Sequence, residues 1–552
     1  MKKLILSLII FNFSFCSAQS WQWGVQGTTI SNNPSEEGWS LARDHTGNLY
    51  LTGFLHGELV LGTDTLNSAF TINSSYCAYL VKYDSNGNVK WARQSVGQTQ
   101  QEGIGVVVDK AGNVYMAGLF YDTAYLGSAR IAARKNILSV FLAKYDSSGN
   151  LLWVRQSDGI LGNGAQLYGV AMDGRNNVYM TGSINGSIAF GPYILQSHGC
   201  FLVKYDSSGN VMWATTPPRA NGIGWSVAAD SIGNSYITGL FADTMFVGRD
   251  TLTGNSTYFL AKYNSSGHGV WAVQAYGGSR GYSVAIDSAG YIYSTGYYLG
   301  NTVIGTDTLL QEGNYGNLFL ARYDSGGNNK WVRYPTYNRI TPNSGCFGLT
   351  LSTDKLCNVY VIAGNFDSLS VNVKFGNINL VLNNGRDIMA LVEYDSSGNA
   401  NCGSILASGG DDQSGFIAEP SGYAVYFGGD LEDTVTFGSD HIGSLGNETI
   451  CLAKWKTCNA ITTVQNLNNE TPEPVVYPNP SSGQFIFQSS VAIGQSLVEI
   501  YNLLGEKVYS QFTLHNSPFT INLSDKPSGI YLYRVTKEDG GLIGEGKIVI
   551  ER

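Results

Sequence analysis

The sequence predicts an all-β protein, because one short phrase recurs along it and because its composition suits strands and turns. The phrase FLVKYDSSGNVMW at residues 201–213 has close copies at 79–91, 141–153, 259–271 and 319–331. A degenerate copy lies at 390–402 and a truncated copy at 451–455. Self-similarity at a fixed period indicates a repeat architecture. Charged residues are only 14% of the chain, whereas there are 68 glycines and 34 tyrosines, which favours short strands joined by tight turns.

A second repeated unit precedes each copy and completes a block of four strands. In the block around residues 201–213, YGVAMD (168–173) and NNVYMTG (176–182) come before FLVKYD and NVMW. Each segment is β-branched or aromatic and is bounded by turn residues, so each predicts a strand. The blocks number seven, with first strands expected at 39–44, 104–109, 168–173, 225–230, 282–287, 347–352 and 415–420.

The two links inside a block have the form Asp-x-x-Gly-Asn, as at Asp44–Asn48 and Asp146–Asn150. In such a turn the Asp accepts hydrogen bonds from backbone N–H groups and the Gly supplies a positive φ, which gives an antiparallel hairpin. The oxygen-rich turns also suggest calcium ligands, but Ca²⁺ needs about six to eight oxygens around one point. Each turn offers one carboxylate and one amide, so we expect a structural turn and no metal.

Four-stranded antiparallel units repeated radially form a β-propeller. Its ends must be closed, and residues 20–27, SWQWGVQG, are similar to the fourth strand VKWARQSVG at 89–97. The seventh block stops after its third strand, at CLAKWKTC (451–458). We therefore predict that residues 21–26 form the outer strand of the last blade. The expected fold is a seven-bladed β-propeller of four-stranded blades closed by an N-terminal strand, followed by a small Ig-like β-sandwich.

Residues 20–458 resemble the seven-bladed β-propeller repeat (SBBP) family of exported bacterial proteins. The shared patterns are D-x-x-G-N-x-Y-x-x-G and F-x-x-K-Y-D-x-x-G-N-x-x-W. The resemblance implies the fold but no particular activity, because propellers host many functions. The second pattern also resembles the tryptophan-docking repeat of quinoprotein propellers, but the vicinal cysteine pair of those dehydrogenases is absent from this sequence. We therefore predict no quinone and no other cofactor.

Residues 1–19 place two lysines before an apolar run and then small residues, which predicts a secretory signal peptide. No other apolar stretch is long enough to span a bilayer as a helix. Without Cys16, seven of the eight cysteines remain, and an odd number in an exported chain requires a free thiol or an intermolecular bond. Several are expected to be small buried residues, and Cys451 with Cys458 is a candidate local disulfide.

Residues 459–474 are polar and end in prolines, which predicts a linker, and the alternating runs of 475–552 predict a small sandwich. This tail resembles the type A C-terminal sorting domain of the type IX secretion system. The matching residues are Pro478, Asn479, Pro480, Gly483, Phe485, the segment 498–508 with Gly505, Gly529, Tyr531, Gly546 and Lys547. The resemblance implies contact with the type IX secretion machinery and a final location outside the cell, either secreted or attached to the outer-membrane surface.

The formal net charge of −9 gives no basic field, so nucleic acid and anionic membranes are not expected partners. The six histidines are scattered, and the chain has no HExxH or GxSxG motif and no phosphate-binding loop. We predict no catalytic residues. A propeller can assemble a site from several blades, so this absence favours a non-enzymatic protein without excluding an enzyme.

One repeat position carries mostly aromatic residues at the start of the first strands. Its expected members are Trp39, Ile104, Tyr168, Trp225, Tyr282, Phe347 and Phe416. They should form a ring around the centre, at the end opposite the tight turns, where long connections such as 54–79 and 297–318 also emerge. An aromatic rim suits stacking on sugar rings or gripping a peptide, so the six aromatic members are the candidate binding residues. Packing between blades is the alternative role.

The long connections repeat a Gly-x-Asp-Thr-Leu phrase at residues 62–66, 248–252 and 305–309, which favours a scaffold role for them. The expected function is that of a secreted or cell-surface binding or adhesion module for a glycan or a protein. The alternatives are an extracellular carbohydrate-active or other enzyme, with its site on the long-loop face, and a structural surface or matrix protein. Exposure of Trp39, Trp225 and Tyr282 is the deciding observation, because burial would remove the candidate site.

Overall fold

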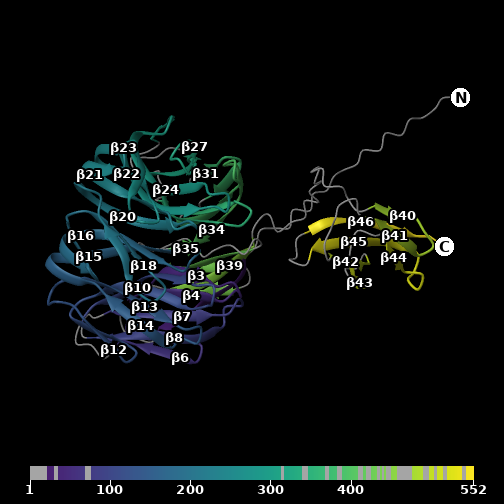
Figure 1. The fold of residues 1–552 in the computed structure, drawn as a ribbon, viewed down its shortest axis with the longest axis horizontal. Coiled ribbons are helices and arrows are strands. Elements are labelled where there is room, and N and C mark those ends of the chain that lie inside the picture. The colour runs from purple at the N-terminus through teal and green to yellow at the C-terminus, as the bar shows by residue number, and fades with distance from the viewer. Residues whose placement is uncertain are drawn as a thin grey trace. The chain divides into compact units, whose positions relative to one another are not determined.

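The computed structural model describes residues 21–29, 35–68, 76–97, 99–311, 316–337, 346–366, 372–381, 388–407, 415–417, 424–431, 435–437, 440–442, 449–456, 475–488, 496–502, 506–513, 519–537 and 542–551. The chain divides into two compact units, residues 1–461 and 462–552. Every regular element in the described ranges is a β-strand (Figure 1), so the all-β prediction is confirmed. The predicted signal peptide and linker lie outside these ranges.

The four segments of a repeat block form one antiparallel sheet in the larger unit. β15 (Asp158–Met172) pairs with β16 (Val178–Phe190), β16 pairs with β18 (Cys200–Tyr205), and β18 pairs with β19 (Val211–Thr215). The same order, first to fourth strand, recurs in the other blocks. Consecutive blocks can share a strand, because the first half of β23 (Gly269–Ile286) ends one sheet and its second half begins the next.

The first strands of the blocks lie at one edge of each sheet and are called the inner strands here. Besides β15 and the second half of β23, they are β3 (Ser35–Arg43), β9 (Gln101–Val108), β20 (Ala220–Ala229), β29 (Phe347–Thr353) and β35 (Gly415–Ile417). The second strands, besides β16, are β4 (Leu49–His56), β10 (Val114–Phe120), β21 (Ser235–Val247), β24 (Ile292–Ile304), β30 (Val359–Phe366) and β36 (Ala424–Leu431). The third strands, besides β18, are β7 (Cys77–Tyr83), β13 (Ser139–Tyr145), β22 (Asp250–Tyr263), β26 (Asn317–Tyr323), β33 (Ile388–Tyr394) and β39 (Thr449–Lys456). The fourth strands, besides β19 and β23, are β8 (Val89–Gly97), β14 (Leu151–Gln156), β27 (Asn329–Arg333), β34 (Ala400–Ala407) and β1 (Trp21–Gln26).

Neighbouring inner strands contact one another in chain order. β3 contacts β9, β9 contacts β15, and the series continues through β20, β23 and β29 to β35, which contacts β3 again. Figure 1 shows the same progression, from purple and blue strands through teal to green strands that lie beside the purple ones. The series of contacts therefore ends where it began.

The core of the larger unit lies between adjacent sheets. One cluster joins Tyr115 and Leu142 of one block to Met180 and Val203 of the next, and all four side chains are buried. Strands covered on both faces explain why the repeated segments are almost continuously apolar. Burial of both faces also fixes the register, since a shift of one residue would exchange the two sets of side chains.

The Asp-x-x-Gly-Asn turns have the predicted geometry. Asp44 Oδ1 accepts hydrogen bonds from the backbone N–H groups of Thr46 and Asn48, both at 2.9 Å, and Gly47 has a φ of 96°. Asp44 Oδ2 accepts from Asn48 Nδ2 at 2.8 Å and from the Tyr50 hydroxyl at 3.1 Å. Burial acts to raise the pKa of the Asp44 carboxyl, whereas the hydrogen bonds from Asn48 and Thr46 act to lower it. The hydrogen bonds have the larger combined effect, so the pKa lies below its usual value. Protein donors thus occupy the carboxylate oxygens.

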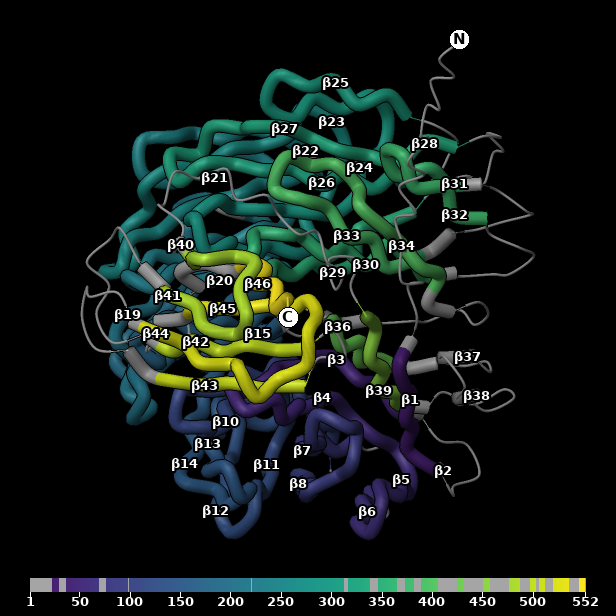
Figure 2. The backbone as a smooth tube through the Cα atoms, turned by 90° about the vertical axis from the view of Figure 1, so that its right-hand side faces the viewer, coloured from purple at the N-terminus to yellow at the C-terminus, as the bar shows by residue number. Residues whose placement is uncertain are grey.

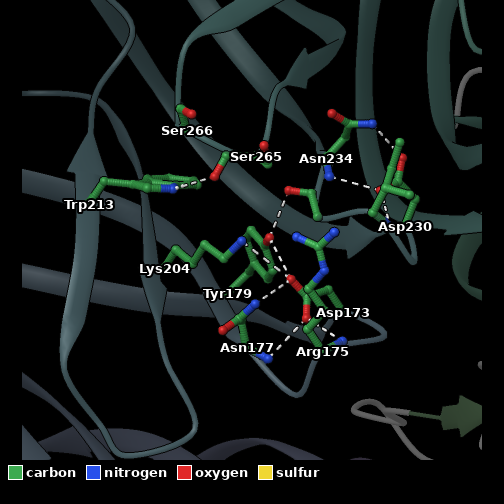
Figure 3. Close-up of polar contacts among 12 residues, drawn as sticks. Asp173, Arg175, Asn177, Tyr179, Lys204, Trp213, Asp230, Asn234, Ser265 and Ser266 are labelled. Carbon is green, nitrogen blue, oxygen red and sulfur yellow. Dashed lines mark hydrogen bonds and ion pairs between the residues drawn. The ribbon is translucent and has the colours of Figure 1, made fainter.

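The tryptophans of the fourth strands dock on the turn between the third and fourth strands of the next block. Trp213 Nε1 donates to the carbonyl oxygen of Ser265 at 3.0 Å (Figure 3). A Cβ at Gly267 would lie 2.7 Å from the Trp213 ring, so the turn glycine also makes room for the ring. Trp91, Trp271 and Trp331 donate in the same way to Ser147, Ser325 and Ser396. These contacts pack each tryptophan against the following block.

The N-terminal strand β1 belongs to the sheet of the last block. It pairs antiparallel with β39, with Trp23 opposite Lys454 and Gln26 opposite Cys451. Figure 2 shows the purple β1 beside the green β39. A Cβ at Gly87 would lie 3.0 Å from the Trp23 ring, so Trp23 docks on the first block as the other tryptophans dock on theirs. The predicted pairing of residues 21–26 is confirmed.

The long connections form short hairpins, as a scaffold role requires. Their strands are β5 (Glu58–Leu61), β6 (Asp64–Asn67), β11 (Thr123–Leu126), β12 (Ala129–Ala132), β17 (Tyr193–Ser197), β25 (Asp307–Leu309), β31 (Asn372–Phe375), β32 (Ile378–Val381), β37 (Val435–Phe437) and β38 (Asp440–Ile442). Two short strands that precede inner strands, β2 (Thr28–Thr29) and β28 (Thr336–Tyr337), pair with β5 and β31. β11 pairs with β8 of the preceding block and so ties two blocks together. The aspartate of the repeated phrase instead ties the connection to the fourth strand of its own block, because Asp64 Oδ2 accepts from Ala92 N at 2.9 Å and Asp250 Oδ2 accepts from Ala272 N at 3.0 Å.

The predicted Cys451–Cys458 disulfide is wrong. Cys451 is not disulfide-bonded, and its side chain is 1% exposed in a core cluster with Met389 and Phe427. Its strand turns the thiol into the core, away from its neighbours in sequence. Cys402 is disulfide-bonded.

We expect a thiol reagent to label Cys357 first in the folded protein. It is half-buried, whereas Cys77, Cys200, Cys346 and Cys451 are buried. Burial also raises the pKa of the Cys77 and Cys200 thiols to about 12, which suppresses the reactive thiolate. Peptide mass mapping after denaturation without reductant should show Cys77, Cys200, Cys346 and Cys357 labelled and Cys402 protected. Labelling of Cys402 would contradict this assignment.

The smaller unit contains two antiparallel sheets. One has the order β40 (Val475–Tyr477), β41 (Gln484–Gln488), β44 (Phe519–Asn522), and the other has the order β43 (Lys507–Thr513), β42 (Ser496–Tyr501), β45 (Gly529–Lys537), β46 (Leu542–Ile550). Phe485, Val498, Ile521, Tyr533 and Ile548 form its buried core, with residues from both sheets.

Candidate binding sites

The inner strands carry β-bulges at one repeat position. In β20, Gly224 pairs with Gly239 and Ser226 pairs with Thr238, so Trp225 is an extra, unpaired residue. The same offset makes Trp39, Ile104, Tyr168 and Tyr282 the extra residues of β3, β9, β15 and β23. A bulge interrupts the alternation of faces and re-aims the side chain it carries. The repeat position singled out in the sequence is therefore the bulge position.

A glycine in the second strand makes room for each of these five bulges. A Cβ at Gly239 would lie 1.8 Å from the carbonyl oxygen of Ile223, two residues before Trp225. The corresponding distances at Gly53, Gly118, Gly182 and Gly296 are 1.8, 2.1, 1.9 and 1.9 Å. Real Cβ atoms do not approach a backbone oxygen so closely. In these five blocks the glycine that ends the repeated Tyr-x-x-Gly phrase therefore leaves room for the bulge opposite it, whereas Ala363 stands at this position in β30, opposite Gly348.

Phe347 does not occupy the bulge position, which corrects the sequence alignment. In β29, Gly348 pairs with Ala363 and Thr350 pairs with Ile362, so Leu349 is the extra residue. The turn after this strand begins at Asp354, and Leu349 precedes that Asp by the same five residues that separate Trp225 from Asp230. Phe416 pairs with Gly428 in β35, and its side chain lies outside the described part of the chain.

Five aromatic rings nevertheless form a continuous series, called the aromatic row here. Its centroid distances are 4.3 Å for Tyr168–Trp225, 5.6 Å for Trp225–Tyr282, 5.6 Å for Tyr282–Tyr297 and 4.4 Å for Tyr297–Phe347. Tyr297 is buried, whereas the other four side chains are half-buried. Each of these four keeps part of its surface open to solvent, so the row has an accessible flank.

Trp39 and Ile104 are not part of the row. The Trp39 ring packs edge-on against Phe54 at 5.6 Å, and its Nε1 donates to Glu37. Ile104 is buried in the core. Sequence reasoning missed Tyr297, which directly follows the glycine Gly296 of the second strand. An aromatic residue after that glycine, as at Phe54 and Tyr297, is the signal that points to a ring beside the bulge.

The aromatic row combines apolar faces with neutral polar groups. Burial, and then the neighbouring Tyr297, raise the pKa of Tyr282 to about 12, and burial raises the pKa of Tyr168. Trp225 Nε1 is buried and has no hydrogen-bond partner among the described residues. The Arg280 guanidinium lies 5.7 Å from the Tyr297 ring centroid. Such a surface can stack on an apolar face and donate hydrogen bonds at neutral pH.

A cavity of ≈ 420 Å³ lies among the inner strands near their tight turns and is called the turn-end cavity here. Arg43, Val108 and Met172, at or beside the ends of β3, β9 and β15, line it together with Lys110. Each bulge residue precedes these strand ends by four positions, about 13 Å along a strand. The Arg43 end of the turn-end cavity is therefore distant from the bulge position, although Ser40 and Val170 of its lining lie one and two residues after the bulge residues Trp39 and Tyr168.

Within the residues that the structure describes, no group of three or more His, Cys, Asp and Glu side chains is placed to hold a metal ion. In that same part of the chain, no helix is both long and apolar enough to cross a membrane.

The structure brings the two ends of the sorting motif together. Asn479 Nδ2 donates to the carbonyl oxygen of Lys547 at 2.7 Å, and Val549 N donates to Asn479 Oδ1 at 2.8 Å. Pro478 and Pro480 flank this Asn on the exposed segment after β40. Gly483 has a φ of 116°, and the buried Tyr531, two residues after Gly529, donates to Pro527 O at 2.8 Å. A Cβ at Gly546 would lie 2.7 Å from the Tyr533 ring, and Gly505 lies outside the described ranges.

Residues 475–551 match the family model described as the secretion system C-terminal sorting domain. This domain directs its carrier through the type IX secretion system, so the protein is secreted or attached to the outer-membrane surface. Among curated proteins, the chain is similar to an uncharacterized WD repeat-containing protein of Acanthamoeba polyphaga mimivirus, 28% identical over 160 residues, which are 26% of this chain. The alignment spans only 11% of that protein's length.

Two solved structures resemble the chain weakly. A fungal alcohol oxidase of the AA5 family in complex with copper has 11% identity and a TM-score of 0.36, with 97% of this chain and all of that chain covered. The polysaccharide lyase Uly1 has 10% identity and a TM-score of 0.35, with 76% and 90% covered.

Proposed function

We propose that the protein is an extracellular β-propeller that binds a glycan through its aromatic row and has no enzymatic role. In this proposal residues 20–458 form seven blades of the SBBP type closed by β1, residues 459–474 are a linker, and residues 475–552 are an Ig-like sorting domain. The return of inner-strand contacts from β35 to β3 supports a ring, as does the docking of Trp23 on the first block. The similarity to a WD repeat-containing protein is in keeping with such a fold.

The half-buried aromatic row carries the binding proposal. Bulges at Tyr168, Trp225 and Tyr282 break the regular sheet geometry at this one position, and the rings contact one another in a series. Stacking on sugar faces needs such a line of partly open rings. Export to the cell surface places the row where glycans are abundant.

Replacing Trp225 by alanine is expected to weaken glycan binding about tenfold or more, because an aromatic anchor contributes about 2 kcal/mol or more when it is central. The full exported protein should first be screened on a glycan array and the best ligand then titrated by calorimetry. Tyr125→Ala is the matched control, because Tyr125 is exposed in the β11–β12 hairpin and makes no ring contact with the row. An absence of glycan ligands, or equal affinity of the Trp225→Ala protein with an unchanged melting temperature, would contradict the proposal.

A further inference from the structure

We infer that the turn-end cavity is a second binding site, in which Arg43 pairs with the carboxylate of an acidic sugar. Arg43 lines the cavity and is half-buried. Its Nε is buried without a hydrogen-bond partner in the described part of the chain. None of the ion pairs among the described residues includes Arg43. A permanently charged guanidinium is thus left without a protein counter-ion.

The two carboxylates closest to Arg43, Asp44 in the sequence and Asp173 in the cavity wall, already have other hydrogen-bond or ion-pair partners. Asp173 lies 3.3 Å from Lys204 Nζ and accepts from the Tyr179 hydroxyl at 3.0 Å (Figure 3). Asp44 accepts from its own turn, as described above. Lys110 adds a second positive charge at the rim, where its Nζ donates to Gly174 O at 3.2 Å. The cavity is therefore positive although the whole chain has a formal charge of −9.

Arg43 departs from the repeat at this position. The residue directly before the turn aspartate is Val108, Met172, Ala229, Ile286 and Thr353 in the following blocks. An apolar or small side chain therefore satisfies the scaffold here, and the fold gives no reason for a cation. The Arg43 guanidinium is not needed by the repeat and has no counter-ion in the cavity. It therefore indicates a ligand that supplies the negative charge.

The size and lining of the cavity favour a small acidic sugar. Its ≈ 420 Å³ falls within the usual range for small-molecule sites, about 300–1,000 Å³. Ser40, Ser352 and Asn176 offer hydroxyl and amide groups to sugar hydroxyls, and Val106 and Val170 form an apolar wall. A guanidinium binds a carboxylate through two parallel hydrogen bonds, which gives selectivity over neutral sugars.

The test is calorimetric titration of the full exported protein with galacturonate and glucuronate. Galactose, acetate and inorganic phosphate serve as comparison ligands. We expect saturable uronate binding that Arg43→Gln weakens at least about tenfold, because a hydrogen-bonded charge pair is lost. Arg43→Lys should weaken uronate binding less, about threefold, because lysine keeps the positive charge but cannot form the two parallel hydrogen bonds. Arg249→Gln is the control, since the Arg249 side chain is 79% exposed in the β21–β22 hairpin.

Four results would overturn the inference, provided that the melting temperatures of the variants match that of the parent protein. They are no saturable uronate binding, galactose or acetate binding as tightly as uronate, uronate binding unchanged by Arg43→Gln, and binding of phosphate in preference to uronate. Trp225→Ala should leave uronate affinity unchanged, which separates this site from the aromatic row.

Discussion

Replacing Gly239 by alanine is expected to lower the free energy of unfolding of the larger unit by about 3 kcal/mol or more, the upper range for an overpacked buried position. The added Cβ would lie 1.8 Å from the carbonyl oxygen of Ile223 and 3.1 Å from the Phe259 ring. The backbone oxygen cannot rotate away as a side chain can, so the bulge at Trp225 must move or flatten. Equilibrium denaturation of the full chain, followed by tryptophan fluorescence, measures the loss.

Gly278→Ala is the matched control for this substitution. Gly278 also lies in a strand, but the nearest atom to its added Cβ is Leu299 O at an ordinary 3.5 Å. We expect its unfolding free energy to stay within about 0.5 kcal/mol of the parent value. Equal stability of the two variants would show that the glycine opposite the bulge is not sterically required.

Removing residues 475–552 is expected to abolish appearance of the protein outside the cell and to leave it in the periplasm. The deleted segment contains the whole match to the sorting domain, including the contact between Asn479 and Lys547 that joins its two ends. The larger unit forms its own compact body and should remain folded. Fractionation followed by immunoblotting of medium, surface and periplasm measures the distribution.

Gln484→Ala is the control for export, because this side chain is exposed on β41 and only one side chain is shortened. The control should reach the medium or the surface at the parent level. Surface display of the truncated protein would show that residues 475–552 are dispensable for export.

Local chemistry explains why the repeated elements could be predicted. The turn at Asp44 uses only residues within four positions, so its hydrogen bonds follow directly from the residue types. The N-terminal strand was predictable because Trp23 repeats the spacing of the fourth-strand tryptophans, and its dock on Gly87 is the same contact. These features depend on short-range patterns that the chain repeats many times.

Features that depend on one block alone were missed or misplaced. Phe347 precedes Asp354 by two residues more than the bulge residues of the other blocks precede their turn aspartates. The bulge residue is therefore Leu349 and not Phe347, and only the pairing register of β29 shows this. Tyr297 joins the aromatic row from a second strand, which alignment of first strands could not show. Cys451 was paired with a close neighbour in sequence, although its strand directs the thiol into the core.

The pairing of β1 with β39 also constrains how the protein folds. Residues 21–26 supply the edge strand of a sheet whose other members come from residues 415–456. This sheet cannot be completed during synthesis until nearly all of the larger unit has emerged, and contacts of such long sequence separation form slowly. Until then β39 keeps an open hydrogen-bonding edge that other chains could pair with. The sorting tail therefore follows, in chain order, a unit whose final strand pairing joins its two ends.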